Sequence, residues 1–173
     1  VPKEPYTVPL GKAKVLREGT DLTVVSSSFM TVEAVKAAAA LAGKVSAEII
    51  DLRTIKPLDF DTISQSVEKT GKLLVADSGY YSGGLAGEII ARVAERMSSK
   101  LKANPKRITL PDLPTPSTHA LSRHYYPSHI NIIKEMCQLA IVPAEQAKSI
   151  IEAEKQKMPA KLDVPDPSFT GPF

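Results

Sequence analysis

The chain has 173 residues, 43 % of them hydrophobic and 24 % charged, which is the composition of a globular protein of about one domain. Its net charge is only +3, and its densest basic cluster, residues 100–107, contains no aromatic residue, so a nucleic-acid partner is not expected. The single cysteine, Cys137, excludes an internal disulfide and a thiolate metal cluster, and no apolar run is long enough to predict a membrane partner.

Hydrophobic periodicity in the first half of the chain predicts strands that alternate with helices. In chain order, the expected elements are a strand at 13–18, a strand at 21–27, a helix at 31–42, a strand at 45–52 and a helix at 59–71. The apolar stripe expected on the first helix consists of Val32, Val35, Ala39 and Ala42. The many alanines of this helix would let it lie close on a sheet.

The second half continues the alternation. The expected elements are a strand at 72–77, a helix at 83–97, a strand at 107–110 and helices at 127–140 and 143–158. Residues 159–173 contain four prolines, which predict either a disordered end or an extended arm on a neighbour.

Several local signals support these boundaries. Asp59 is expected to cap the start of the helix at 59–71, and Gly71 to cap its end. In the helix at 83–97, Glu88 and Arg92 form an i,i+4 pair. The stripe expected to face the core of that helix consists of Leu85, Ile89, Val93 and Met97.

Strands that alternate with helices over short loops predict an α/β fold, with a mainly parallel sheet covered on both faces. Ligands approach such sheets at the carboxyl ends of the strands, where the winding direction switches. The segments at those ends are 26–31, 51–59 and 77–84.

The glycine-rich stretch at 77–84 resembles a nucleotide loop but lacks the required residues. Gly84 and Gly87 match the last two glycines of the dinucleotide fingerprint, but Ser82 occupies the first position. A phosphate loop would need Lys and then Ser or Thr after Gly84, where Leu85 follows. Gly83 and Gly84 are therefore expected to serve backbone geometry and close helix packing, with Tyr80 and Tyr81 facing a neighbouring domain.

No other segment predicts a self-sufficient catalytic site or a metal site. His119, His124 and His129 are spaced by five residues, so they do not share one helical face. The serines at 26–28 lack the glycines of a nucleophile elbow. The chain is therefore interpreted as an accessory domain.

Several strings together resemble one known family. VPLGKAKVLREGTDLTVVSSS, AEIIDLRTIKPLDFDTI, SVEKTGKLLVADS and GGLAGEI are similar to the carboxyl-terminal domain of the β subunit of thiamine diphosphate-dependent 2-oxo acid dehydrogenases. These are the decarboxylating components of the pyruvate, branched-chain and acetoin complexes. The resemblance covers about residues 8 to 140, and DLRTIKPLD is also shared with deoxyxylulose phosphate synthases.

The resemblance implies a three-layer α/β/α domain with a five-stranded, mostly parallel sheet whose first strand is antiparallel. It also implies oxidative decarboxylation of a 2-oxo acid with acyl transfer to a lipoyl group, using thiamine diphosphate and magnesium. In the family these cofactors are bound elsewhere: by an amino-terminal domain of the same subunit and by an α subunit. This chain alone is therefore expected to hold no cofactor, no metal and no catalytic residue, and to be inactive.

Two departures concern the lipoyl acyltransferase core, a further expected partner. Lys102 stands where relatives often have an acidic docking residue, and about 33 residues follow the point where relatives usually end. The implied domain division is a linker at 1–12, the transketolase C-terminal-like domain at 13–142, and an extra helix and proline-rich arm at 143–173.

The expected role is subunit association and shaping of the substrate entrance, within a homodimer or an α₂β₂ assembly. The candidate interface or entrance residues are Ser27, Ser28, Phe29, Tyr80, Tyr81, Gly83, Gly84, His119 and His124. Two alternatives remain open: a transketolase or deoxyxylulose phosphate synthase, for which Arg53 and Lys56 would hold a sugar phosphate, and a stand-alone binding module. One unpaired cysteine fits a reducing compartment, either the bacterial cytoplasm or the mitochondrial matrix.

Overall fold

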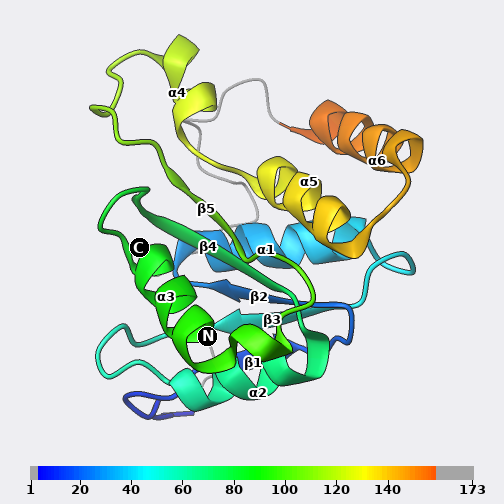
Figure 1. Ribbon diagram of the computed structural model, residues 1–173. Helices are drawn as coiled ribbons and strands as arrows, with labels where there is room; N and C mark the ends of the chain where they lie inside the picture. The colour runs from blue at the N-terminus through cyan, green and yellow to red at the C-terminus, as the bar shows by residue number, and fades with distance from the viewer. Residues whose placement is uncertain (1–3, 159–173) are drawn as a thin grey trace.

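Residues 4–158 are described by the structure, a computed structural model, and they form a five-stranded sheet between two layers of helices (Figure 1). The strands are β1 (Lys14–Arg17), β2 (Leu22–Ser26), β3 (Ala47–Asp51), β4 (Leu73–Tyr80) and β5 (Lys106–Leu110). The helices are α1 (Phe29–Ala40), α2 (Phe60–Thr70), α3 (Leu85–Met97), the short η1 (Ser98–Lys100), α4 (His119–Tyr125), α5 (His129–Ala140) and α6 (Ala144–Lys157).

The strand order is β1-β3-β2-β4-β5, with β1 antiparallel to β3 and the other neighbours parallel. This arrangement confirms the predicted fold class, including the antiparallel first strand. None of the helices in residues 4–158 is long and apolar enough to cross a bilayer.

The central strand β2 is buried on both faces. Leu22 and Val24 pack in the core beneath α1 and α5, whereas Val25 packs in the core beneath α2 and α3. Thr23 is also fully buried, but its hydroxyl lies 2.6 Å from Ser66 Oγ and 2.8 Å from Thr70 Oγ1, both on α2. These hydrogen bonds satisfy the one polar side chain that alternation directs into the second core.

A glycine allows the chain to enter β2. A Cβ atom at Gly19 would lie 2.2 Å from the backbone carbon of Ala47 on β3, closer than any side chain can approach. Gly19 also donates its backbone N–H to Glu48 Oε2. The close crossing of these two segments therefore depends on the absence of a side chain at this position.

The predicted packing face of α1 is wrong. Val32, Val35, Ala39 and Ala42 are all exposed, whereas Met30, Ala34, Ala37 and Ala38 form the buried face. Both faces of α1 are apolar, so periodicity alone did not distinguish them. The small residues are inside because they let the helix lie close to β2 and β3, as the alanine content predicted in general terms.

The predicted boundaries of the other elements agree more closely with the structure. Asp59 Oδ1 accepts a hydrogen bond from Thr62 N, and Gly71 ends α2 in the left-handed region with φ 74°, so both predicted caps are confirmed. The predicted Glu88–Arg92 pair is also present, at 2.6 Å. Strand β4, however, continues through Tyr80 rather than ending at Asp77, and α4 was not predicted.

Helix α6 packs on α5 and shares its core. Val142, Ala147, Ile150 and Ile151 are partly buried against the α1–α5 side of the sheet. The described part of the carboxyl-terminal extension therefore extends the domain rather than forming a separate body.

His129 links helix α5 to helices α1 and α6. His129, at the start of α5, directs Nδ1 and its backbone N–H to Glu33 Oε2 on α1, at 3.0 and 2.7 Å. Its Nε2 lies 3.9 Å from Glu154 Oε2 on α6. Burial would raise the pKa of Glu33, but hydrogen bonds from His129 and Lys36 outweigh it and lower the pKa to about 2.

Replacement of Gly19 by alanine is expected to destabilise the fold by at least ~2 kcal/mol, because the new methyl group would overlap the β3 backbone. The matched control is Gly43→Ala, at φ 75° with no atom within 4 Å of its Cβ position, which should cost only about 1 kcal/mol. Chemical denaturation of both variants measures the difference. Equal losses for the two would contradict the close crossing.

Glu33 should make the fold sensitive to acid. Because its folded pKa is about 2 and its reference value is 4.5, its contribution is complete above about pH 4.5 and lost as the pH falls towards 2. Glu33→Gln should therefore be less stable than the parent chain at pH 6, and this difference should shrink between pH 4.5 and 2. A difference that does not change with pH would show that the Glu33 charge has no such role.

Candidate functional site

The carboxyl ends of β2, β3, β4 and β5 meet at one edge of the sheet, at the left in Figure 1. The winding direction reverses between β2 and β4, because the helix after β2 covers one face and the helix after β4 covers the other. At this switch point Ser27 Oγ donates a hydrogen bond to Asp77 Oδ1, at 3.3 Å. This is the position at which open α/β sheets bind ligands or partners.

Two residues at this edge adopt unfavourable backbone conformations. Ser28 has φ 53° and Arg53 has φ 56°, although neither is glycine. Such conformations each cost about 1–3 kcal/mol and concentrate at functional sites. The loops after β2 and β3 are therefore held in fixed shapes by the surrounding structure.

The turn after β4 is tied to the turn after β5. Ser82 donates two hydrogen bonds to Asp112, from its backbone N–H at 2.9 Å and from its hydroxyl at 2.6 Å. These two bonds, with a smaller contribution from the charge of Arg107, hold the pKa of Asp112 below its usual value. Tyr81 N also donates to Leu110 O. Ser82, the residue that breaks the nucleotide fingerprint, thus anchors the loop.

The glycines of this turn meet two backbone requirements. Gly83 has φ 70°, in the left-handed region, and a Cβ on Gly84 would lie 2.2 Å from Tyr80 O. Gly84 then precedes α3, so the turn passes directly from strand to helix. These geometries match the expectation of backbone shape and close packing for the two residues.

Arg107 and Tyr81 form a stacked pair beside this turn. The Arg107 guanidinium carbon lies 3.5 Å from the centroid of the Tyr81 ring, within the range of a cation–π interaction. Arg107 comes from β5 and Tyr81 follows β4, so the pair fixes the ring across two strands. Tyr81 nevertheless remains half exposed.

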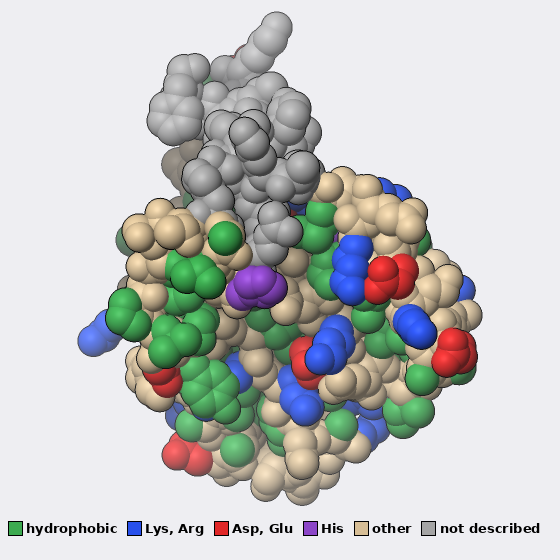
Figure 2. Space-filling view, turned by 90° about the horizontal axis from the view of Figure 1, so that it is seen from above, with side chains coloured by type: hydrophobic (Ala, Val, Ile, Leu, Met, Phe, Trp, Pro, Cys, Tyr) green, Lys and Arg blue, Asp and Glu red, His purple; other side chains and the backbone are tan. Residues whose placement is uncertain are grey.

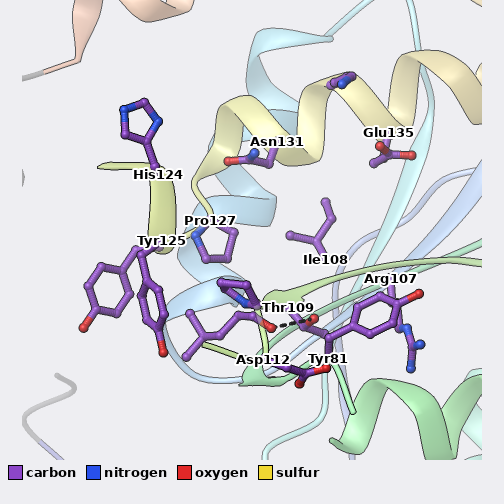
Figure 3. Close-up of a pocket in the computed structure, with 14 residues that line it drawn as sticks. Tyr81, Arg107, Ile108, Thr109, Asp112, His124, Tyr125, Pro127, Asn131 and Glu135 are labelled. Carbon is purple, nitrogen blue, oxygen red and sulfur yellow. Dashed lines mark hydrogen bonds between the residues drawn. The ribbon is translucent and has the colours of Figure 1, made fainter. Parts of the chain in front are cut away.

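A pocket of about 550 Å³ lies between this pair, α4 and α5 (Figure 3). Its lining residues are Tyr81, Arg107, Ile108, Thr109, Leu110, Pro111, Asp112, His124, Tyr125, Tyr126, Pro127, Asn131, Lys134 and Glu135. In Figure 3 Asn131 and Glu135 lie on α5 at one side of the pocket, and Tyr81 and Arg107 lie at the other side. Glu135 Oε2 is buried and accepts no hydrogen bond from the described residues, although Lys106 Nζ lies 4.0 Å away.

Large apolar side chains are exposed along the carboxyl edge, and two of them, Tyr81 and Tyr126, line the pocket. We call this set the edge surface; its members are between 47 and 62 % exposed and are Phe29, Ile55, Tyr80, Tyr81, Leu113, Leu121 and Tyr126. They come from the start of α1, from the end of β4, from the loops after β3, β4 and β5, and from α4 and the residue that follows it. Figure 2, viewed from the side of α4 and α6, shows apolar side chains gathered towards the α4 side and charged ones towards the other. A surface of this kind marks an interaction site.

Tyrosine side chains connect helix α4 to the carboxyl edge of the sheet. Tyr125 is buried, and its hydroxyl donates to Leu113 O at 3.1 Å. Hydrogen bonding with Tyr125 raises the pKa of the Tyr80 phenol above its usual value. The edge surface therefore has internal support and is not a set of unconnected loop residues.

The structure brings most of the predicted site residues together. Ser27, Ser28, Phe29, Tyr80, Tyr81, Gly83 and Gly84 all lie at the carboxyl edge, and His124 lines the pocket from α4. His119 begins α4, but its side chain lies outside the described part of the structure.

Lys102 lies at the opposite edge of the sheet. Its side-chain carbons cover Gly71, at the end of α2, and its backbone N–H donates to Gly71 O. Lys102 and the edge surface therefore lie at opposite ends of the parallel strands.

Sequence reasoning missed Arg107, Asp112 and Leu113. Their partners are distant along the chain: Ser82 and Asp112, for example, are 30 residues apart. The prolines that flank the loop after β5 were the only local signal there, and they predict an irregular segment without indicating its contacts.

Residues 4–158 contain no group of three or more His, Cys, Asp or Glu side chains placed to hold a metal ion. Cys137 is buried, and burial raises the pKa of its thiol, which disfavours a nucleophilic role. The side chains displayed at the edge offer aromatic and aliphatic contacts with a few fixed charges, which suit recognition.

Three comparisons with known proteins bear on the family of this chain. The family described as transketolase, C-terminal domain, matches residues 11–132. The β subunit of the pyruvate dehydrogenase E1 component of Bacillus subtilis is 42 % identical over 135 residues, covering 78 % of this chain and 41 % of the relative. The β subunit of the acetoin:2,6-dichlorophenolindophenol oxidoreductase of Cupriavidus necator is 40 % identical, covering 76 % and 39 %.

A solved structure described as a split gene transketolase, inactive β4 tetramer, superposes with a TM-score of 0.66 at 26 % identity, covering 76 % of this chain and 43 % of that one. The chain thus spans about two fifths of the length of these relatives.

Removing the Asp112 carboxylate should loosen the turn after β4. In Asp112→Ala the two hydrogen bonds from Ser82 are lost, and amide hydrogen exchange at Ser82 and Gly83 should accelerate about tenfold or more. The control is Asp61→Ala, an exposed carboxylate in the first turn of α2. Unchanged protection at Ser82 in the Asp112 variant would show that the anchor does not hold the turn.

Proposed function

Because the chain belongs to the transketolase C-terminal domain family, we propose that it is the carboxyl-terminal domain of the β subunit of a thiamine diphosphate-dependent 2-oxo acid dehydrogenase. Its role is to associate with neighbouring domains and subunits and to shape the substrate entrance. The similar β subunits of pyruvate and acetoin enzymes support this choice, because they are about 40 % identical over three quarters of the chain.

The edge surface is the observation that carries the proposed role. Seven large apolar side chains are exposed along the carboxyl edge, and hydrogen bonds join the turns after β4 and β5 that carry some of them. A half-exposed ring such as Tyr81, already fixed by Arg107, loses little conformational entropy when a partner covers it. This preorganisation is what a permanent interface requires.

Thiamine diphosphate and magnesium are the cofactors that the proposed enzyme needs. The described residues do not fit a magnesium site, since no three candidate ligands converge. The proposal therefore assigns both cofactors to an amino-terminal domain of the same subunit and to an α subunit, and no catalytic step to this chain. The proposed assembly is a homodimer of β subunits or an α₂β₂ enzyme.

A transketolase-type transferase is the second candidate, because the solved structure with the same fold is a transketolase. A sugar phosphate would require cations at the carboxyl edge. Arg53 and Lys56 both follow β3 at that edge, and Arg53 Nε is 3.9 Å from Asp51 Oδ2. The first candidate is favoured on the higher identity of the dehydrogenase relatives.

The complete reading frame that contains this chain, expressed with its α partner, should decarboxylate a 2-oxo acid in a reaction that needs thiamine diphosphate and magnesium. Reduction of an artificial electron acceptor measures this activity with pyruvate and branched-chain 2-oxo acids as substrates, and acetoin, which has no carboxylate to lose, is tested in parallel for oxidative cleavage. Tyr81→Glu should weaken assembly about tenfold or more, because a buried interface would have to accept an unpaired charge.

The matched control is Ile141→Glu, an exposed apolar residue outside the edge surface. Analytical ultracentrifugation and activity are measured on the same preparations. Transfer between sugar phosphates without 2-oxo acid decarboxylation would favour the second candidate, and normal assembly of the Tyr81 variant would contradict the role given to the edge surface.

A further inference from the structure

The pocket between α4, α5 and the end of β5 has the lining of a site for proline-rich chain. Its walls include three tyrosines and two prolines, which are Tyr81, Tyr125, Tyr126, Pro111 and Pro127. The rings of Tyr125 and Tyr126 meet edge to face with centroids 4.9 Å apart, so they form one wall on the α4 side. Aromatic-lined grooves of this kind bind extended, proline-rich segments, because such segments have little conformational entropy to lose.

The chain itself carries a segment of that composition. Residues 159–173, with the sequence PAKLDVPDPSFTGPF, follow α6 and contain four prolines and two phenylalanines. We call them the carboxyl-terminal arm; they lie outside the described part of the chain. Prolines favour the polyproline II conformation, and phenylalanine rings pack well against tyrosine rings. The composition of the arm therefore complements the lining of the pocket.

Helix α6 ends beside residues that line the pocket. Glu154 Oε2, in the last turn of α6, lies 3.9 Å from His129 Nε2 at the start of α5. Pro127 and Asn131, two residues before and two residues after His129, both line the pocket. In Figure 1 α6 runs from the end of α5 back towards α4. The arm therefore leaves the described part of the chain next to the α4 side of the pocket.

The arm is long enough to cross the pocket. Its residues would span about 45 Å in the polyproline II conformation, at ~3.1 Å per residue. The first few residues suffice to pass the start of α5, which leaves Pro165, Pro167 and Phe169 for the pocket. A tethered segment of this length has an effective concentration of about millimolar at its own pocket, well above that of a second copy in dilute solution. Its own pocket is therefore favoured over that of a neighbouring copy.

Charge also favours the arm as the occupant. The arm carries two aspartates and one lysine. Lys134 lines the pocket from α5, is exposed, and has no acidic partner among the described residues. The two carboxylates of the lining already have neighbours: Asp112 accepts from Ser82, and Glu135 Oε2 lies 4.0 Å from Lys106 Nζ. The free charge at the pocket is therefore positive, which suits an acidic segment.

We propose that the carboxyl-terminal arm, residues 159–173, binds in the pocket of its own chain, with its prolines and phenylalanines against Tyr126 and Pro127. The arm covers the α4 side of the pocket and leaves Tyr81 and Leu113 to another domain. This inference goes beyond the proposed function and does not depend on it.

Tryptophan fluorescence of the full chain tests the contact, because the sequence contains no tryptophan. Tyr126→Trp places a single indole on the pocket wall. The expected emission is blue-shifted and protected from acrylamide quenching, and it should be independent of protein concentration. Adding Phe169→Ala and Phe173→Ala to this variant should shift the emission to the red and remove the protection.

Identical emission with and without the two phenylalanines would overturn the proposal. A blue shift that appears only as the protein concentration rises would overturn it as well, since the arm would then bind a neighbouring copy.

A synthetic peptide of residues 159–173 tests the specificity of the pocket. Added to the chain that carries Tyr126→Trp, Phe169→Ala and Phe173→Ala, it should restore the blue-shifted emission in a saturable titration. A peptide with alanine at both phenylalanine positions should bind about tenfold more weakly or worse, because the two rings no longer bury their apolar surface.

Lys134→Glu in the same chain should raise the dissociation constant of the peptide about threefold, as the loss of an exposed ion pair predicts. The matched control is Lys148→Glu, an exposed lysine of α6 that does not line the pocket. Equal affinity of the two peptides, or equal effects of the two lysine substitutions, would contradict the proposed seat of the arm.

Discussion

The burial of β2 on both faces is the constraint on which the structure depends. A strand covered by helices on each side needs parallel neighbours joined by crossover helices, and those connections place all the strand ends of one direction at one edge. The strand is apolar except for Thr23 and Ser26, and Thr23 is satisfied by two hydroxyls of α2. The segment that leads into β2 passes so close to the backbone of β3 that only a residue without a side chain, Gly19, fits there. The position of the candidate site follows from this packing.

The site itself is a surface for recognition. Hydrogen bonds from Ser82 to Asp112 and the stack of Arg107 on Tyr81 join the loops after β4 and β5. The surrounding structure holds Ser28 in a strained backbone conformation in the loop after β2. The side chains displayed at this edge are mainly apolar and half exposed, as the proposed interface requires. Helix α1 is apolar on its inner face and also exposes Val32 and Val35 on its outer face.

Local pattern in the sequence predicted the strands of the sheet and the caps of α2, whereas the antiparallel first strand was implied by the family resemblance. Prediction from the sequence failed where the local pattern was compatible with two different structures. Both faces of α1 carry apolar residues, so the choice between Val32 and Ala34 depended on how closely the helix approaches the sheet. The end of β4 was placed too early because Gly79 suggested a turn, yet pairing with β5 carries the strand to Tyr80. The contacts of Asp112, Arg107 and Tyr125 join distant segments, so no periodicity could indicate them.

An electron-microscopic or crystallographic structure of the complete assembly tests the central claim most directly. The quantity to measure is the solvent exposure of Tyr81 and Leu113 in the assembled enzyme. The account predicts that both side chains are covered by another domain or subunit, with the Ser82–Asp112 hydrogen bonds and the Arg107–Tyr81 stack intact. An assembly in which both remain as exposed as they are in the single chain would contradict it.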